Sequence, residues 1–156
     1  MFENGNYPVF NGGINPSGFF DKYNTDENTI AISQGGASAG YVNFVKVKFW
    51  ASAHCYTVKP NTNSVVNKYL FYYLKNGQNI LQNSKLGAGI PGLSARELLN
   101  FKIPIPSLSE QKRIVSILDK FEALVNDISE GLPAELKARR QQYEHYREKL
   151  LTFKSQ

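Results

Sequence analysis

Residues 101–131 read FKIPIPSLSEQKRIVSILDKFEALVNDISEG, and within this stretch the sequence changes from one kind of structure to another. Pro104 and Pro106 exclude a helix at the start of the stretch and favour an extended edge strand there. Ser107 and Glu110 then have the spacing of a capping box, which marks the first turn of a helix. The stretch therefore predicts the point at which a globular body gives way to a helical region.

The helix predicted after Ser107 carries a heptad seam. Its apolar residues step by alternating intervals of 4 and 3 positions, at Ile114, Leu118, Phe121, Val125 and Ile128. This spacing is typical of a helix that packs along another helix. Gly131 and Pro133 then break or redirect the chain, and Pro133 is well placed in the first turn of a new helix.

A second apolar row follows the same intervals, at Leu132, Leu136, Arg139, Tyr143, Tyr146, Leu150 and Phe153, with Arg139 as its one interruption. A helix over residues 133–153 would be about 30 Å long, and each large apolar side chain that it buries contributes roughly 1.5–3 kcal/mol. We therefore expect the row to be covered. A hairpin with the preceding helix, docking on the body and an intermolecular bundle all remain open, although tyrosine and arginine beside the seam favour an interface.

Upstream of residue 101 the sequence begins with short strands. Residues 1–40 are rich in glycine and asparagine, and TIAIS at 29–33 predicts a buried strand. Residues 41–52 alternate in part and predict a strand, and HCYTVKP at 54–60 predicts another. In the alternating strand Val45, Val47 and Phe49 would point one way, and Lys46 and Lys48 the other.

The next part of the body is helical. Residues 65–83 have helical spacing, with Gly77 as an interruption or an end. Leu70, Tyr73 and Leu74 share one face of that helix. LGAGIPGLS at 86–94 predicts a loop, after which Ser94 and Glu97 form a second capping box at the start of a short helix.

The 156 residues thus divide into a mixed-sheet body of the α/β (α+β) class, residues 1–106, and a coiled-coil-like helical region, residues 107–156. The formal net charge is +5, and the body holds nine lysines and arginines against five acidic residues. Mild basicity fits a nucleic-acid partner but is common in other domains. Cys55 is the one cysteine, which excludes an internal disulfide and a cysteine-rich zinc site. Because neither a signal peptide nor a long apolar run is visible, we expect a cytoplasmic protein without a membrane span.

The motifs of common enzymes are missing. The sequence contains no GxGxxG, no GxxxxGK[ST] and no GxSxG motif. His54 and His145 lie in different predicted elements, so a structural or surface role is favoured for both. The pair at 26–27, Asp-Glu, is best interpreted as a solvated turn. SQGGASAG at 33–40 is small and flexible, and is equally consistent with a loop that approaches a phosphate and with a wide hairpin.

Residues 102–153 contain the pattern IPIPxLxEQKRIVxILDKF followed by LPAExxxRRxQYxxYRxKLL. This combination is long and specific, and it strongly resembles the specificity subunit of type I restriction–modification systems. The upstream segments ISQGGASAGYV, FWASAHCYTV, KYLFYYLK and GAGIPGLSARELLNFKIPIP resemble the target recognition domain of that family. The resemblance covers most of the chain.

The resemblance implies a non-catalytic protein that binds double-stranded DNA. In the family a recognition domain reads one half of a split DNA target, and the helices that follow separate two such domains and dock methyltransferase subunits. S-adenosylmethionine, ATP and Mg²⁺ belong to partner subunits, so we expect no cofactor here, and contact with the restriction/translocase subunit would be indirect. The residues implied at the partner interface are Leu132, Leu136, Tyr143, Tyr146, Leu150 and Phe153, flanked by Arg139, Arg140 and Arg147.

The chain departs from the family in two respects. It has one recognition domain and one helical region where the family usually has two of each, so we expect a homodimer of half-subunits, which would read a palindromic split target. The segment that usually precedes NGNYPVFNGG is also missing, which would fit a truncated product or one completed by another chain. Two other functions stay open: an interaction protein that binds methyltransferase subunits without reading DNA, and the specificity module of a fused restriction enzyme.

Side-chain chemistry suggests which residues of the body would contact DNA. Asparagine, glutamine and serine have the donors and acceptors that read base edges in the major groove, and lysine holds phosphates. The predicted DNA-binding residues are Asn11, Asn15, Ser33, Gln34, Ser38, Lys46, Lys48 and Lys85.

Overall fold

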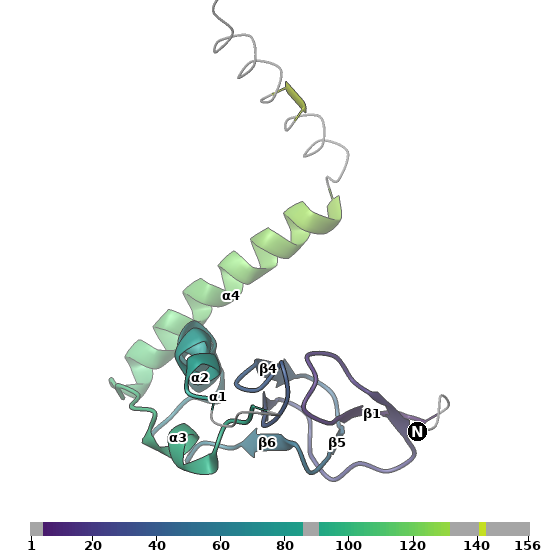
Figure 1. The fold of residues 1–156 in the computed structure, drawn as a ribbon. Helices are drawn as coiled ribbons and strands as arrows, with labels where there is room; N and C mark the ends of the chain where they lie inside the picture. The colour runs from purple at the N-terminus through teal and green to yellow at the C-terminus, as the bar shows by residue number, and fades with distance from the viewer. Residues whose placement is uncertain (1–4, 86–90, 132–140, 143–156) are drawn as a thin grey trace, which may run out of the picture. The chain divides into compact units, whose positions relative to one another are not determined.

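The computed structural model describes residues 5–85, 91–131 and 141–142. The chain forms two compact units, Met1–Val115 and Ser116–Gln156. The first unit contains both helices and strands, as the predicted mixed α+β class requires (Figure 1). It also includes about two turns of the helix that begins after Ser107.

The strands form two sheets of three strands each. One sheet has the order β2-β1-β5, in which β1 runs antiparallel to β2 and parallel to β5. The other has the order β4-β3-β6 and is antiparallel throughout. The strands are β1 Tyr7–Phe10, β2 Gly18–Phe20, β3 Thr29–Ser33, β4 Val42–Val45, β5 Trp50–Ala51 and β6 Cys55–Val58.

Strand β3 is the centre of the second sheet, and all five of its residues are buried. Ile30 and Ile32 project to one face of the sheet and Ala31 to the other, as the period of a strand dictates. Ile30 and Ile32 belong to the main core, whereas Ala31 packs with Phe10 and Val45 in a second cluster. The continuous apolar run at 29–33 therefore reflects burial on both faces, and the strand predicted there is confirmed.

The single strand predicted over residues 41–52 is wrong. The chain leaves the second sheet after Val45 and joins the first sheet at Trp50, where Val9 is the partner. Val47, in the connection, is 55% exposed. The alternation in this segment therefore spans a change of sheet, and Val47 does not share a face with its buried neighbours.

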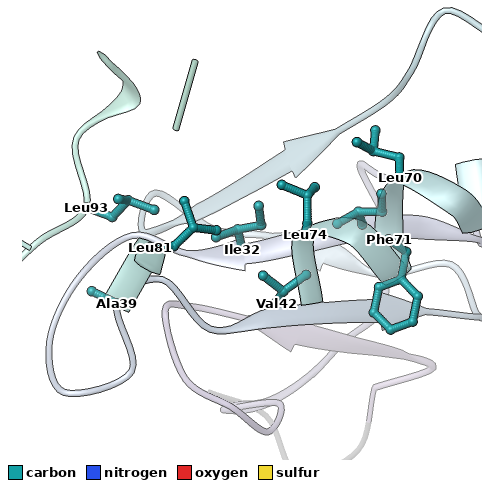
Figure 2. Close-up of a cluster of buried hydrophobic side chains, with 9 residues drawn as sticks. Ile32, Ala39, Val42, Leu70, Phe71, Leu74, Leu81 and Leu93 are labelled. Atoms are coloured by element: carbon teal, nitrogen blue, oxygen red, sulfur yellow. The ribbon is translucent and has the colours of Figure 1, made fainter. Parts of the chain in front are cut away.

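The described residues of the body also form the helices α1 Asn67–Asn76, α2 Gln78–Asn83 and α3 Ala95–Asn100. Gly77 separates the first two, as predicted, and a Cβ there would overlap the ring of Phe101. The main core lies between the helices α1 and α2 and the sheet β4-β3-β6 (Figure 2). It contains Ile30, Ile32, Ala39, Val42, Leu70, Phe71, Leu74, Leu81 and Leu93.

Both predicted helix caps are present. The Ser94 hydroxyl oxygen accepts a bond from the Glu97 N–H at 3.2 Å, at the start of α3. The Ser107 oxygen accepts one from the Glu110 N–H at 3.3 Å, at the start of helix α4, Leu108–Gly131. These bonds satisfy backbone donors that a first helical turn leaves without intrahelical partners.

The edge strand predicted over residues 101–106 is not formed. The segment pairs with no strand of the described chain. Side chains donate to its carbonyls instead. The Tyr69 hydroxyl donates to the Pro104 oxygen at 2.9 Å, and the Gln111 amide donates to the Pro106 oxygen at 2.8 Å. The prolines therefore remove the helix, as expected, without adding a strand.

Candidate nucleic-acid interface

The connection between β3 and β4, residues 34–41, is a wide hairpin. Gly36 and Gly40 have φ values of 74° and 85°, which side-chain-bearing residues adopt at a cost. A Cβ on Gly40 would also lie 2.7 Å from the Gln82 nitrogen, so the hairpin passes very close to α2. The hairpin interpretation of this glycine-rich stretch is confirmed, and the glycines are the residues that permit it.

Two other segments lie against this hairpin. Residues 11–17, between β1 and β2, are attached to it through the Ser33 hydroxyl, which donates to the Gly13 carbonyl at 3.1 Å. His54, directly before β6, accepts a bond from the Gln34 N–H on its carbonyl oxygen at 2.9 Å. Segments that are far apart in the sequence thus meet beside the end of β3.

Residues 91–93 complete the group. The Leu93 N–H donates to the Gln34 carbonyl at 2.7 Å, and the Gly36 N–H donates to the Pro91 carbonyl at 2.9 Å. We refer to residues 11–17, 34–40, 52–54 and 91–93 as the loop cluster. Backbone hydrogen bonds connect the hairpin with residues 52–54 and 91–93, and the Ser33 hydroxyl holds residues 11–17, so the exposed side chains of the cluster lie on a defined framework.

The loop cluster brings together several of the predicted DNA-binding residues. Asn11 and Asn15 are exposed in the first segment, and Gln34 and Ser38 are half-buried in the hairpin. Lys85 joins them from the end of α2, because its Nζ donates to the Ala37 carbonyl at 2.9 Å. These residues share one region of the molecule despite their separation along the chain.

Ser33 lies beneath this region rather than on it. Its side chain is 4% exposed and its hydroxyl is bonded to the Gly13 carbonyl. Both facts give Ser33 a structural role in holding residues 11–17, and we leave it out of the residues proposed to read DNA.

Lys46 and Asn15 both line a hollow of about 410 Å³ between residues 11–17 and the end of β4. The Asn43 side chain closes one side of this hollow by donating to the Ile14 carbonyl at 2.8 Å. The Lys46 side chain is exposed, so its ammonium group is available to an anion.

Lys48 has a different environment. Its Nζ donates to the Tyr23 hydroxyl at 3.2 Å and lies 4.5 Å from the centre of the Tyr23 ring. This hydrogen bond raises the pKa of Lys48, and the charges of Glu27 and Asp26 act in the same direction. Lys48 is therefore held charged beside the segment between β2 and β3.

The acidic residues are unevenly distributed along the sequence, which the net charge alone does not show. Residues 28–96 contain no aspartate or glutamate. They contain seven basic residues, namely Lys46, Lys48, Lys59, Lys68, Lys75, Lys85 and Arg96. The sheet β4-β3-β6, the helices α1 and α2 and most of the loop cluster fall in this acid-free stretch, so these parts carry positive charge only. Such a surface attracts a polyanion.

His54 is a residue that sequence reasoning assigned to a structural or surface role. Its side chain is exposed, and a Cβ on Gly12 would lie 3.3 Å from the Cβ of His54. The imidazole therefore sits where the first segment and the hairpin meet. Only the long-range packing reveals this, because nothing next to His54 in the sequence points to residues 11–17.

Helix α4 presents an apolar row. Ile117, Phe121 and Leu124 are 41%, 61% and 56% exposed, and Ile114 and Leu118 are half-buried. All nine residues predicted at the partner interface lie outside the described residues: Leu132, Leu136, Arg139, Arg140, Tyr143, Tyr146, Arg147, Leu150 and Phe153. Within the described part of the chain, no group of three or more histidine, cysteine or acidic residues could hold a metal ion, and no helix there has both the length and the hydropathy of a membrane span.

Comparison with known proteins gives a consistent result. The family profile of the type I restriction modification DNA specificity domain matches residues 2–138. The specificity subunit of the Escherichia coli type I enzyme EcoR124I/EcoR124II is 40% identical over 111 residues, which are 70% of this chain and 27% of that protein. A Haemophilus influenzae protein provisionally designated a type I restriction enzyme specificity subunit is 47% identical over 125 residues, 80% of this chain and 32% of that protein.

The fold agrees with the sequence comparison. A crystal structure of the type I restriction-modification system S subunit from M. genitalium superposes with a TM-score of 0.73 at 28% identity, and the match covers 96% of this chain and 39% of that one. The chain thus spans less than half the length of each of these relatives. With the family profile matched over most of its residues, this chain belongs to the family of type I restriction–modification DNA specificity subunits.

Proposed function

We propose that the chain is a non-catalytic DNA-specificity module that reads one half of a bipartite target and docks methyltransferase subunits. The observation that carries the proposal is the coincidence of the family match over residues 2–138 with a loop cluster in an acid-free, basic part of the chain. Its compartment would be the cytoplasm, where chromosomal DNA is accessible to it.

Base reading is assigned to the polar side chains of the loop cluster. Asn11, Asn15, Gln34 and Ser38 offer the paired donors and acceptors that distinguish base pairs in the major groove. His54 adds a ring nitrogen that can accept or donate at the same place. The hydrogen bonds that hold these loops support this role, because a rigid framework reduces the entropy lost when DNA binds.

Phosphate binding is assigned to lysines around the cluster. Lys46 is exposed and lines the same hollow as Asn15, and Lys85 donates to the Ala37 carbonyl of the hairpin. Lys48, held charged by Tyr23, would contribute to the field that attracts DNA rather than to a contact inside the cluster. Each phosphate that such a lysine neutralises releases counterions, which makes binding depend on salt.

Docking is assigned to the helical region. Helix α4 exposes Ile117, Phe121 and Leu124, and the residues predicted at the interface follow this helix in the sequence. Methyltransferase subunits would supply the chemistry with S-adenosylmethionine, and a restriction/translocase subunit using ATP and Mg²⁺ would join through them. A second copy of the chain would supply the other half-site reader, so that two-fold symmetry gives a palindromic split target.

The test is assembly followed by selection. The full chain is mixed with the methyltransferase subunit of the same system, the complex is isolated by gel filtration, and it is then used to select DNA from a random library. The proposal predicts a complex that enriches two short, inversely related sequences at a fixed separation. A complex that forms and enriches no sequence would favour an interaction protein that does not read DNA, and would overturn the proposal.

A further inference from the structure

Gln111 is the most thoroughly buried polar side chain described in helix α4. It is 0% exposed, although it lies in a segment whose neighbours Lys112 and Arg113 are exposed. Its amide nitrogen donates to the Ser64 carbonyl at 3.0 Å and to the Pro106 carbonyl at 2.8 Å. Both amide protons are therefore used inside the protein.

The amide oxygen of Gln111 has an equally defined partner. It accepts a bond from the Val66 N–H at 2.8 Å. Val66 is the residue before α1 and cannot cap that helix with its own side chain. Because an unpaired buried amide is costly, the side chain and these three backbone groups depend on one another.

These contacts connect two helix starts. Residues 64–66 lead into α1, which packs on the main core, and Pro106 lies directly before the capping residue of α4. One side chain thus fastens the first turn of α4 to the backbone at the start of α1. All of the groups involved belong to the unit Met1–Val115.

We propose that Gln111 is a positioning residue that fixes the direction in which α4 leaves the recognition body, and thereby the separation of the two half-sites in the DNA target. This inference rests on the proposed function. A helix of this length extends about 36 Å, so a tilt of about 10° at its start displaces its far end by about 6 Å. That displacement is close to two base-pair steps, since successive steps are about 3.4 Å apart.

The test uses the full chain assembled with methyltransferase subunits. Gln111→Met keeps the length of the side chain and removes all three hydrogen bonds, and Lys112→Met is the matched control on the exposed side of the same turn. Methylation is measured on DNA in which the two selected half-sites are separated by different numbers of base pairs. For Gln111→Met, the preference for the best separation over its neighbours should fall about fivefold to tenfold, which corresponds to the loss of about one net hydrogen bond. The half-site sequences should stay the same.

A second variant removes the donor of the hydrogen bond that the Gln111 amide oxygen accepts. Val66→Pro removes the N–H that donates to Gln111, and the φ of −72° at Val66 is one that proline adopts. Val66→Pro should also weaken the preference for the best separation of the half-sites over its neighbours. In the unsubstituted chain, the amide of Val66 should exchange its hydrogen slowly although it precedes α1.

The outcomes separate the two proposals. A wild-type complex that selects no sequence would remove the proposed function itself. A selective wild-type complex whose preferred separation is unaltered in folded Gln111→Met or Val66→Pro would overturn the positioning role alone. Fast exchange of the Val66 amide in the wild type would overturn it as well, without any variant.

Discussion

At the residue scale, single amide side chains replace the hydrogen bonds that longer strands would provide. Asn24 donates to the Ala51 carbonyl at 2.8 Å and accepts from the Ala51 N–H at 2.7 Å, so it pairs with β5 as a strand residue would. Gln111 likewise bonds to backbone groups at the starts of two helices. The partners Ala51 of Asn24 and Val66 of Gln111 are 27 and 45 residues away in the sequence, which is why no local pattern predicts them.

The first residue-scale prediction concerns Lys46. Lys46→Ala should lower affinity for all DNA sequences to a similar degree and reduce the salt slope of binding by about 0.9, because one phosphate contact is lost. Binding is measured over a series of salt concentrations, with Lys102→Ala, an exposed lysine outside the loop cluster, as the control. Loss of affinity confined to one base position would show that Lys46 reads a base instead.

The second concerns Cys55, which is the only thiol. Burial raises the pKa of the Cys55 thiol to about 11, whereas the ordinary value is 9.0. Between these two values the unfolded chain loses the proton first, so the native state is destabilised as the pH rises. The free energy of unfolding of the wild type relative to Cys55→Ala should therefore fall from pH 9 to pH 11, as measured by urea denaturation. A difference that stays constant over this range would mean that the thiol ionises equally in both states.

At the scale of elements, the sequence predicts well wherever one local rule decides the outcome. The buried strand at 29–33, the interruption at Gly77 and the caps at Ser94 and Ser107 are all present. The failures occur where pairing across the chain decides. Residues 41–52 alternate like one strand, but the pairing of β5 with β1 divides them between two sheets. The proline segment forms no strand, because the Tyr69 hydroxyl and the Gln111 amide donate to its carbonyls.

The hairpin between β3 and β4 supplies the element-scale prediction. Gly40→Ala combines a left-handed backbone with a Cβ only 2.7 Å from the backbone of α2, whereas Gly36→Ala has a similar φ and nothing within 4 Å. The left-handed conformation alone costs about 1–2 kcal/mol. Gly36→Ala should therefore lose about that amount of stability, and Gly40→Ala clearly more, in urea denaturation. Equal losses would show that the hairpin can move away from α2.

At the scale of the whole molecule, the body and the helical region present different surfaces. The body exposes polar side chains on loops in an acid-free stretch, and α4 exposes large apolar side chains. The body surface could be anticipated in part, because Asn11, Asn15, Gln34, Ser38 and Lys85 do come together. The position of His54 beside residues 11–17 and the interior position of Ser33 depend on how loops pack, which residue type alone does not determine.

The exposed row of α4 gives the prediction at this scale. Phe121→Glu places a charge in the row and should greatly weaken association with methyltransferase subunits or with a second copy, because a buried unpaired carboxylate is costly. Ala123→Glu, an exposed position off the row, should have little effect. Sedimentation velocity of the chain alone and with the methyltransferase subunit measures both. Unchanged association of Phe121→Glu would remove α4 from the docking surface.

The claim on which the rest depends is that this chain directs a methyltransferase to a DNA sequence. The measurement is a map of methylated adenines or cytosines after the complex of the chain with its methyltransferase subunits has acted on DNA of high sequence diversity. The account predicts methylation at one bipartite motif with inversely related halves, and loss of sequence selectivity when Asn15 and Gln34 are both replaced by alanine. Methylation that ignores sequence, or a motif that is unchanged when the exposed side chains of the loop cluster are replaced, would contradict it.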